Sequence, residues 1–563
     1  MLGIGATRVA QRIDAAIGMG QSGAIQFESC ESVSRGGLMC MLPFLISQGL
    51  LSYRSYYSER EGGYYNYDSI ILLLSFMYLG RIKNPEKLKH ESPGELGKLL
   101  GLDRVPEVRC LRSIFNELSQ QQQSSNWNAY LAGEWIQENN ENIFYIDGHV
   151  QVYHGNLANL GKKHVSRQKL CLPGTIDFWV NNVEGNPYFY VTGEVNEKLQ
   201  EMLKTQIIEK IKNLSPEKFS VINELDNYTP VFTVIFDREG YSPELFRQLW
   251  QEHKVAVITY NKNVKDVWDE ENFSIYEIVD NEGNKIEMEL CEKEVELSGV
   301  KMREIRRKCD GGHQTSVITT NRKISTMLIA LYMFARWCQE NFFRYMRLEY
   351  DIDKLIQYGI EQIDIDFKIV NPNHTKLTYE IKKLREKISR RQAQLLELIQ
   401  KNIDNVLENT NQNMQKQLKL QNEIEQHKVK EQELLHKRKE IQYKITIGEM
   451  PESTRYNKLL TECKLLQNVI KFICYRAETA FVNLIDEEYK RKTHEKRALF
   501  KSLTHTKADI IPDYLNKTLT IIIYSLSTPR DNRAIEKTLA LLNDTETVFP
   551  GTELRLIYKI TSI

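Results

Sequence analysis

The sequence predicts a mixed α/β protein that has a helical N-terminal region, a long helical arm and a small α+β C-terminal unit. Strand-like segments alternate with amphipathic helices between about residues 140 and 350, which is typical of an α/β layer. Apolar residues then recur at heptad spacing, and the last ninety or so residues again mix strands with a helix. The 75 Lys and Arg balance the 75 Asp and Glu, so a polybasic binder is excluded, whereas local basic patches for nucleic acid are not.

The first domain, residues 1–125, is expected to be helical. Within ESPGELGKLLGLDRVPEVRCLRSIFNEL, Ser92 and Glu95 have the spacing of a capping box, and Gly101 separates two apolar-faced helices. This 92–118 pair fits a DNA-binding helix-turn-helix, but an ordinary helical hairpin has the same pattern. The glutamine and serine run at 120–125 indicates a linker.

The second domain, residues 140–350, is expected to contain a sheet and its covering helices. The predicted strands, rich in aromatic and β-branched residues, are FYIDGHVQVYHG, NPYFYVTGEV, VFTVIFD and KVAVITY. Amphipathic helices are predicted over 197–214 and 242–251, and a strong helix over 322–348. Apolar and polar residues alternate on both sides of a predicted turn at 281–284, which predicts a β-rich insertion at about 265–315.

The third segment, residues 376–446, is expected to form a coiled-coil arm. Leucine and isoleucine alternate by four and three residues, with one polar lapse at Arg391, and an Asn-rich stretch at 402–413 could reverse the chain. A hairpin and a homodimerising coil both remain open. The fourth segment, 465–563, is expected to be an α+β domain with strands TLTIIIYSL and ELRLIYKI around a helix at 534–542.

Three carboxylates stand out by context. Asp147 lies in a strand, Asp237 ends a buried-type strand, and Glu340 lies in the middle of a helix. An acid at a strand end of an α/β sheet projects into the crevice where ligands bind. Three carboxylates that converge repel one another unless cations neutralise them, and hard oxygen ligands favour Mg²⁺ or Mn²⁺. Among 75 acids some such triplet is certain, so the pattern gains weight only from its surroundings.

Those surroundings resemble a known family, the DDE transposases of the insertion-sequence type. The resemblance rests on three segments: FYIDGHVQVYHG, VFTVIFDREGYSPELF and ALYMFARWCQENFFRYMR. The family's last helix has Tyr, two residues, Arg, three residues, Glu, six residues and Lys. Here Arg336, Glu340 and Arg347 occupy the Arg, Glu and Lys positions. Met333 stands in the Tyr position, with Tyr332 one residue earlier, and Arg347 replaces the family's Lys.

The resemblance implies an RNase H-like catalytic core with a β-rich insertion between the second Asp and the Glu. It implies cleavage of double-stranded DNA at the ends of a mobile element and strand transfer into a target. Asp147, Asp237 and Glu340 would be both the catalytic residues and the ligands of two Mg²⁺ or Mn²⁺ ions, while Arg336 and Arg347 would contact DNA phosphates. A synapse needs two active sites, so we expect a homodimer, formed through the coil or on DNA.

Two basic segments add possible DNA contacts. The first segment is HVSRQKL, which contains Arg167 and is preceded by Lys162 and Lys163. The second is KMREIRRK, which contains Arg306 and Arg307. A solvated charged loop explains each segment equally well.

Two other functions share some of these features: an RNase H-like nuclease that cuts without joining, and a catalytically decayed coiled-coil interaction protein. A P-loop ATPase and a histidine zinc enzyme are disfavoured, because the chain lacks the phosphate-loop motif, and His149 and His154 would lie on opposite strand faces. Nine scattered cysteines, and apolar stretches too short to span a membrane, indicate a cytoplasmic protein with no membrane partner, associated with the nucleoid if bacterial.

Overall fold

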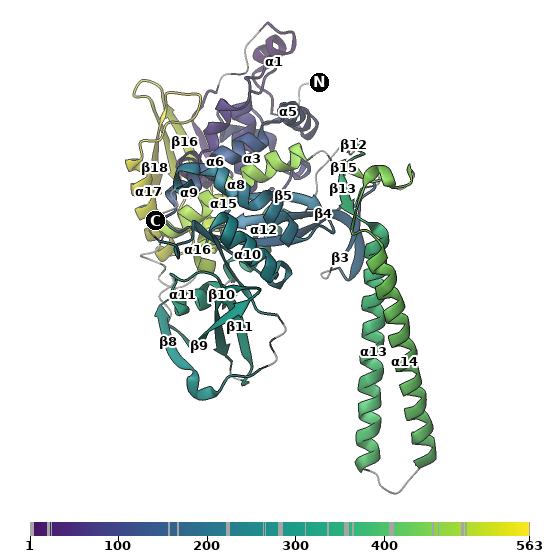
Figure 1. Ribbon diagram of the computed structural model, residues 1–563. Helices are drawn as coiled ribbons and strands as arrows, with labels where there is room; N and C mark the ends of the chain where they lie inside the picture. The colour runs from purple at the N-terminus through teal and green to yellow at the C-terminus, as the bar shows by residue number, and fades with distance from the viewer. Residues whose placement is uncertain are drawn as a thin grey trace.

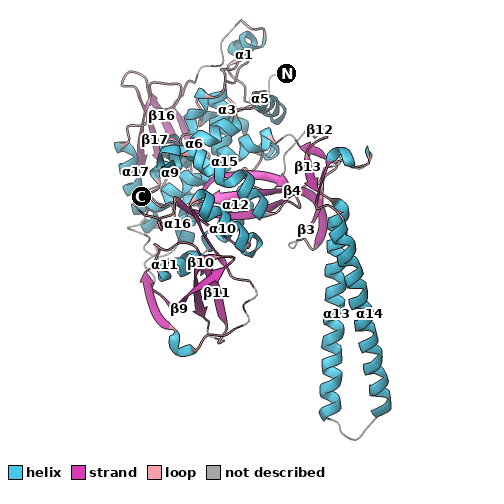
Figure 2. Cartoon of the chain, viewed as in Figure 1, coloured by secondary structure: helices cyan, strands magenta, loops and turns pink. Residues whose placement is uncertain are grey.

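The structure is a computed structural model of a mixed α/β chain with one long projecting arm (Figures 1 and 2). It describes residues 5–561 apart from several short segments. The segments outside the described part are 20–22, 24, 156–157, 166–167, 221–225, 263, 265, 280–284, 310, 335–336, 354–359, 363–364, 405–409, 453–454, 460, 486–488 and 490–492. The side chains of residues 337–340, within a described helix, are also outside it.

The N-terminal region is helical, as predicted. Its helices are α1 (Val9–Ala16), α2 (Leu42–Ser47), α3 (Tyr67–Leu79), α4 (Pro93–Lys98), α5 (Val108–Gln120) and α6 (Ser124–Glu138). Ser92 does begin α4, but its side chain makes no capping bond, because Glu95 instead contacts Lys98 and the Ser34 amide. The predicted linker is only the short turn between α5 and α6, and α6 buries Trp127 and Trp135.

The main sheet has ten strands in the order β3-β4-β2-β6-β7-β11-β10-β9-β8, with β5 paired to β4. Its first strands are β2 (Ile143–Val152), β3 (Lys162–Val165), β4 (Leu170–Asn181), β5 (Pro187–Glu194), β6 (Phe232–Phe236) and β7 (Val255–Tyr260). Neighbours β2, β6 and β7 run parallel, whereas β4 is antiparallel to β2 and β5. The sheet is therefore mixed, with parallel strands at its centre.

The predicted β-rich insertion extends this same sheet. It consists of β8 (Ser274–Val279), β9 (Lys285–Leu297), β10 (Val300–Lys308) and β11 (Gln314–Thr319), all antiparallel to their neighbours. Strand β11 pairs with β7 and so joins the insertion to the parallel strands. The predicted turn at 281–284 lies outside the described residues, and β8 and β9 flank it as a hairpin.

Helices cover both faces of the sheet. They are α7 (Leu199–Met202), a π-helical turn (Leu203–Ile207), α8 (Ile208–Leu214), α9 (Pro216–Ser220), α10 (Pro243–His253), α11 (Thr326–Phe334) and α12 (Trp337–Tyr350). The six apolar residues that recur at helical spacing in the predicted 197–214 helix are all buried: Leu199, Met202, Leu203, Ile207, Ile208 and Ile211. The single helix predicted over 322–348 corresponds to α11 and α12, and residues 335–336 between them are not described.

The arm is a hairpin of two long helices, α13 (Pro372–Asp404) and α14 (Thr410–Glu440), which lie side by side along their length (Figure 1). Leu384 and Ile388 of α13 pack against Ile424 of α14, so the heptad positions are covered within the chain. The ion pairs Arg385–Glu431 (2.6 Å) and Arg391–Glu423 (3.0 Å) also join the two helices. The reversal lies within the predicted 402–413 stretch, part of which is outside the described residues.

Short strands join the arm to the body. They form two two-stranded sheets: β12 (Ile360–Gln362) with β15 (Asn457–Leu459), and β13 (Lys368–Val370) with β14 (Lys444–Thr446).

The C-terminal part holds a second sheet of four strands, ordered β1-β16-β17-β18. Its elements are β1 (Cys30–Val33), α15 (Glu462–Leu484), α16 (Thr493–His505), β16 (Ala508–Asp513), β17 (Thr518–Ile523), α17 (Pro529–Asp544) and β18 (Arg555–Ile560). The N-terminal strand β1 pairs with β16, and α15 packs among the N-terminal helices. One hydrophobic core thus contains residues from both ends of the chain.

No described helix is long and apolar enough to cross a membrane.

Candidate active site

Asp147 and Asp237 lie at corresponding positions of adjacent parallel strands. Strands β2 and β6 pair in parallel up to Ile146 and Phe236, and each acid is the next residue after that last pair. Neighbouring strands lie about 4.8 Å apart, so continuing the register by one residue brings the two backbones close together. The two predicted acids therefore meet at the same edge of the sheet.

Both carboxylates are half-buried, and each is oriented by backbone hydrogen bonding. Asp147 Oδ1 accepts from the Gly148 amide at 2.8 Å. Asp237 Oδ1 accepts from the Arg238 amide at 2.6 Å, where the chain leaves β6 for a short 3₁₀ turn. Each acid thus combines a fixed backbone with a side chain that solvent can still reach.

Helix α12 covers the sheet face onto which Asp147 projects. Directly opposite Asp147 on the antiparallel strand β4 is Trp179, whose side chain must share that face. The Trp179 ring contacts Phe342 and Phe343 of α12 at centroid distances of 5.5 and 5.9 Å. His149, two residues along β2 on the same face, stacks on Phe343 at 5.1 Å.

The remaining predicted residues of this helix are only partly described. Glu340 lies in α12, but its side chain is outside the described part, as is all of Arg336. Arg347 is half-buried, and its Nε donates to the Phe343 carbonyl at 3.2 Å.

A cavity of about 540 Å³ lies between β2, β3 and α12. Its charged and polar lining includes Asp147, His149, Lys163, Glu239, Arg344 and Arg347. Glu239, which follows Asp237 by two residues, lines the cavity together with Asp147. The cavity combines carboxylates with cations, as a site that binds a metal ion and a phosphate together requires.

Buried charges from the C-terminal part hold α12 in place. Glu478 of α15 is fully buried and accepts hydrogen bonds from Tyr345 and from Tyr350 (2.7 Å), both on α12. Arg81 and Arg497 pair with the same carboxylate at 2.9 and 2.7 Å. Although burial opposes ionisation, these arginines and tyrosines lower the pKa of Glu478 to about 2.

The basic residues predicted to bind DNA differ in their environments. Lys162 is exposed on β3, Lys163 lines the cavity, and Arg167 lies outside the described residues. Arg307 is half-buried on β10, with its guanidinium 5.4 Å from the centre of the Phe334 ring.

Arg306 does not suit the predicted role. Its side chain is 2% exposed and pairs with Asp266 at 2.9 Å and Glu304 at 2.7 Å, and it lies over the Trp268 ring. A guanidinium engaged on all sides in this way is not available to a DNA phosphate, so we leave it out of the candidate site.

Sequence reasoning missed several residues that the cavity brings together. His149 Nε2 lies 2.5 Å from Asp353 Oδ1, and Asn341 and Arg344 line the cavity beside Phe343. Their only signal in the sequence is nearness to Asp147 or Glu340. Among the described residues, no group of three His, Cys, Asp and Glu is arranged to hold a metal ion.

Comparison with known proteins identifies the family. No curated protein matches the chain. A family model described as a transposase protein matches residues 3–562, which is nearly the whole sequence. With that coverage, the chain belongs to this family of transposases.

Proposed function

We propose that this transposase is a DDE enzyme with an RNase H-like core, which cleaves DNA strands at the ends of a mobile element and joins them to a target. The observation that carries the proposal is the register of β2 and β6, in which Asp147 and Asp237 follow the last pair of parallel neighbours. Asp237 lies directly after the end of β6, and ligand sites of open α/β sheets form at such strand ends.

The third acid of the proposed site is Glu340. Positions 340, 343 and 347 follow one another on α12 at the three- and four-residue spacing of a single helix face. Phe343 contacts His149 and Trp179 on the Asp147 face of the sheet, and Arg347 lines the cavity. The helix geometry thus favours Glu340 as a partner of the two aspartates.

The residues fit a hard divalent cation. Carboxylate oxygens that are half-buried beside an open polar cavity are ligands that Mg²⁺ and Mn²⁺ prefer. When bound by Asp147, Asp237 and Glu340, such ions would supply an activated nucleophile and stabilise the leaving oxygen of a phosphodiester. Lys163, Arg344 and Arg347 would orient the phosphate that enters the cavity.

The test replaces each acid by its isosteric amide: Asp147→Asn, Asp237→Asn and Glu340→Gln. Each change should lower cleavage of an end-containing DNA duplex roughly 10³-fold or more, the loss expected when about 4 kcal/mol of transition-state stabilisation disappears. DNA affinity in a mobility-shift assay should stay within about threefold, since phosphate contacts dominate binding.

The matched control is Glu239→Gln, which removes a carboxylate from the same cavity but not from the proposed triad. It should retain most of the cleavage. Cleavage retained after any one of the three amide changes would refute that assignment. Adding a target plasmid separates the two enzyme functions, because a nuclease would cut the ends yet leave no joined product.

We further propose that two copies of the chain meet on DNA. The apolar seam of the arm is occupied within the chain, since Leu384 and Ile388 pack on Ile424, which favours assembly on DNA over pairing through the arm. Light scattering should give a monomer mass for the free protein and a dimer mass after addition of element-end DNA. A DNA-free dimer dissociated by Leu384→Asp would contradict this route.

A further inference from the structure

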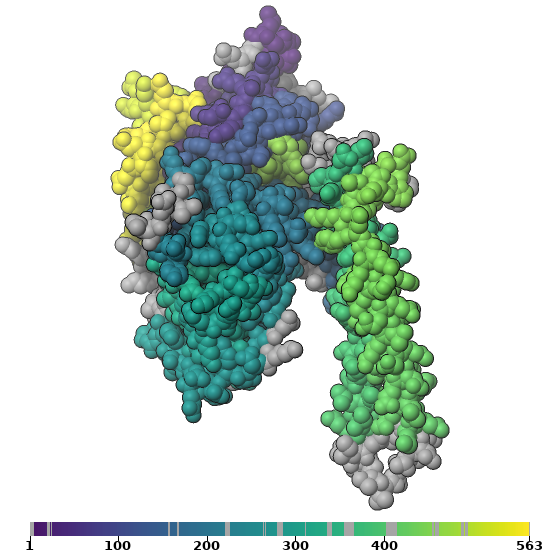
Figure 3. All heavy atoms as spheres, viewed as in Figure 1, coloured from purple at the N-terminus to yellow at the C-terminus, as the bar shows by residue number. Residues whose placement is uncertain are grey.

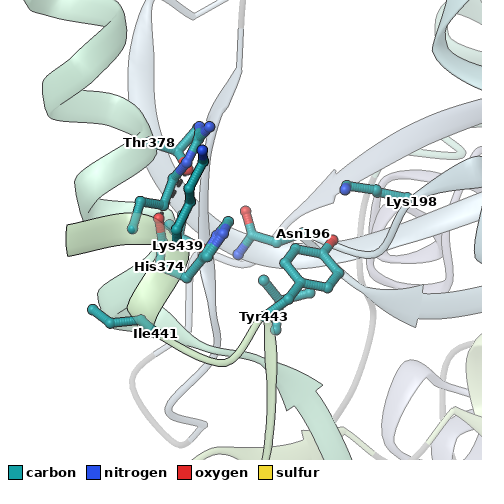
Figure 4. A pocket seen from close by; sticks show the side chains of 10 residues that line it. Asn196, Lys198, His374, Thr378, Lys439, Ile441 and Tyr443 are labelled. Atoms are coloured by element: carbon teal, nitrogen blue, oxygen red, sulfur yellow. Dashed lines mark hydrogen bonds between the residues drawn. The ribbon is translucent and has the colours of Figure 1, made fainter. Parts of the chain in front are cut away.

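A second cavity, of about 610 Å³, lies where the arm meets the body (Figure 4). Three segments far apart in the sequence line it: the chain after β5, the start of α13 and the end of α14. Their polar side chains are those of Asn196, Lys198, His374, Thr378, Arg438 and Lys439. This cavity shares no lining residue with the candidate active site.

The cations around this cavity are not neutralised. In the part of the chain that the structure describes, no carboxylate lies within 4.0 Å of the charged nitrogens of Lys198, Arg438 or Lys439. Glu197, the acid next to Lys198, is already paired with Lys444 at 2.9 Å. Three cations without an acidic partner around a single cavity favour an anionic ligand, which would pair with them.

Two further features favour an anion here. Burial lowers the pKa of His374, and the nearby charges of Arg438 and Lys198 lower it further. The cavity also opens at the first turn of the 33-residue helix α13, where the helix dipole attracts negative charge. In Figure 4, Lys198 approaches the cavity from the body side, Lys439 from the arm side, and Tyr443 from the chain that follows α14.

We propose that this cavity binds phosphates of the DNA backbone and thereby anchors a duplex between the arm and the body. The identity of the DNA as element end or target rests on the function proposed above, but the binding itself does not. Residues 372–440 contain 15 Lys and Arg and 10 Asp and Glu in a chain of zero net charge, so the arm extends the basic surface. Figure 3 shows an open gap between the outer part of the arm and the body.

The experiment measures affinity for a short duplex by fluorescence anisotropy at several salt concentrations, in the Asp147→Asn background so that no DNA is cut. The test variant is Arg438→Gln/Lys439→Gln, and its matched control is Lys430→Gln/Lys437→Gln, which removes two exposed charges from the same helix outside the cavity. A second pair comes from the body: Lys198→Gln, with Lys204→Gln as its control.

We expect the cavity double variant to raise Kd roughly tenfold near 0.1 M salt and to flatten the plot of log K against log salt by about 2, one unit for each lost phosphate contact. Lys198→Gln should flatten it by about 1, and both controls by much less. Circular dichroism spectra and melting temperatures should match those of the parent.

Equal effects of the test and control pairs would overturn the proposal, because the loss would then reflect overall charge alone. Competition by inorganic phosphate at matched ionic strength distinguishes the other source of the same chemistry. If phosphate ion binds the cavity while duplex affinity does not depend on it, the site serves a free anion and the proposal fails. Failure of the cleavage test above would leave these binding results unaffected.

Discussion

At the scale of single residues, the buried carboxylate of Glu478 has the largest predictable effect on stability. It neutralises Arg81 and Arg497 and accepts from two tyrosines of α12. Glu478→Gln would remove the charge partner of Arg497 and leave Arg81 paired only with Glu349, which should cost about 3 kcal/mol or more in the free energy of unfolding. Urea denaturation measures this loss. Glu452→Gln, whose side chain is 88% exposed, should change stability by less than about 0.5 kcal/mol.

The same carboxylate gives stability a defined pH dependence. Its pKa falls from an ordinary value of 4.5 to about 2 on folding, so the ionised form stabilises the folded state at pH values above 4.5. That contribution is lost as the pH falls from 4.5 towards 2. The stability difference between the parent and Glu478→Gln should therefore shrink over this interval. If the stability difference stayed constant between pH 4.5 and 2, the titration of Glu478 would not be its cause.

At this scale the sequence predicted the two aspartates that lie on strands, but it did not predict which side chains surround them. Asp147 and Asp237 were marked by the apolar runs that precede them, which became β2 and β6. The contacts of His149 with Phe343 and of Asp177 with Lys464 join residues about 200 and 290 positions apart, and no local pattern announces such pairs.

At the scale of elements, periodicity predicted the strands and helices whose burial is regular. Periodicity missed β4, because the first half of that strand contains Pro173 and Gly174, which are typical of turns. Yet β4 is central to the site, since its Trp179 lies between β2 and α12. The π-helical turn between α7 and α8 kept all six predicted apolar positions buried even though its spacing departs from 3.6 residues.

The arm provides a test of its own at this scale. Leu384 is 7% exposed and packs in the seam with Ile424, whereas Leu396 of the same helix is 61% exposed. Leu384→Ala should destabilise the hairpin by about 2 kcal/mol, through lost burial and the cavity left behind. Hydrogen exchange followed by mass spectrometry should then accelerate across α13 and α14 but not in β2.

The matched substitution, Leu396→Ala, should leave exchange in both helices nearly unchanged. Equal acceleration by the two variants would mean that the hairpin is not held together by the seam seen in the structure.

At the scale of the whole molecule, the two ends of the chain depend on each other. Strand β1 pairs with β16, and helix α15 packs against α3 and α6 within the core that also includes the main sheet. Local patterns predicted an N-terminal helical region and a C-terminal α+β unit as separate stretches, and they contain nothing that reveals a shared core. The arm, by contrast, was predictable because its partners are close in sequence and repeat regularly.

This difference between body and arm leads to a prediction for the whole chain. Arg385 and Glu431 face each other across the hairpin at 2.6 Å, so a four-residue Gly/Asn turn can join residues 385 and 431 and remove the outer arm. Because the body's core contains none of the deleted residues, the melting temperature of the body should change by less than about 2 °C. Affinity for DNA should still fall, since the outer arm extends the basic surface while the cavity at its base is retained. Calorimetry measures the melting temperature and fluorescence anisotropy measures the DNA affinity of the same preparation. A collapse of the melting transition would show that the arm supports the fold, and unchanged affinity would show that DNA does not reach the outer arm.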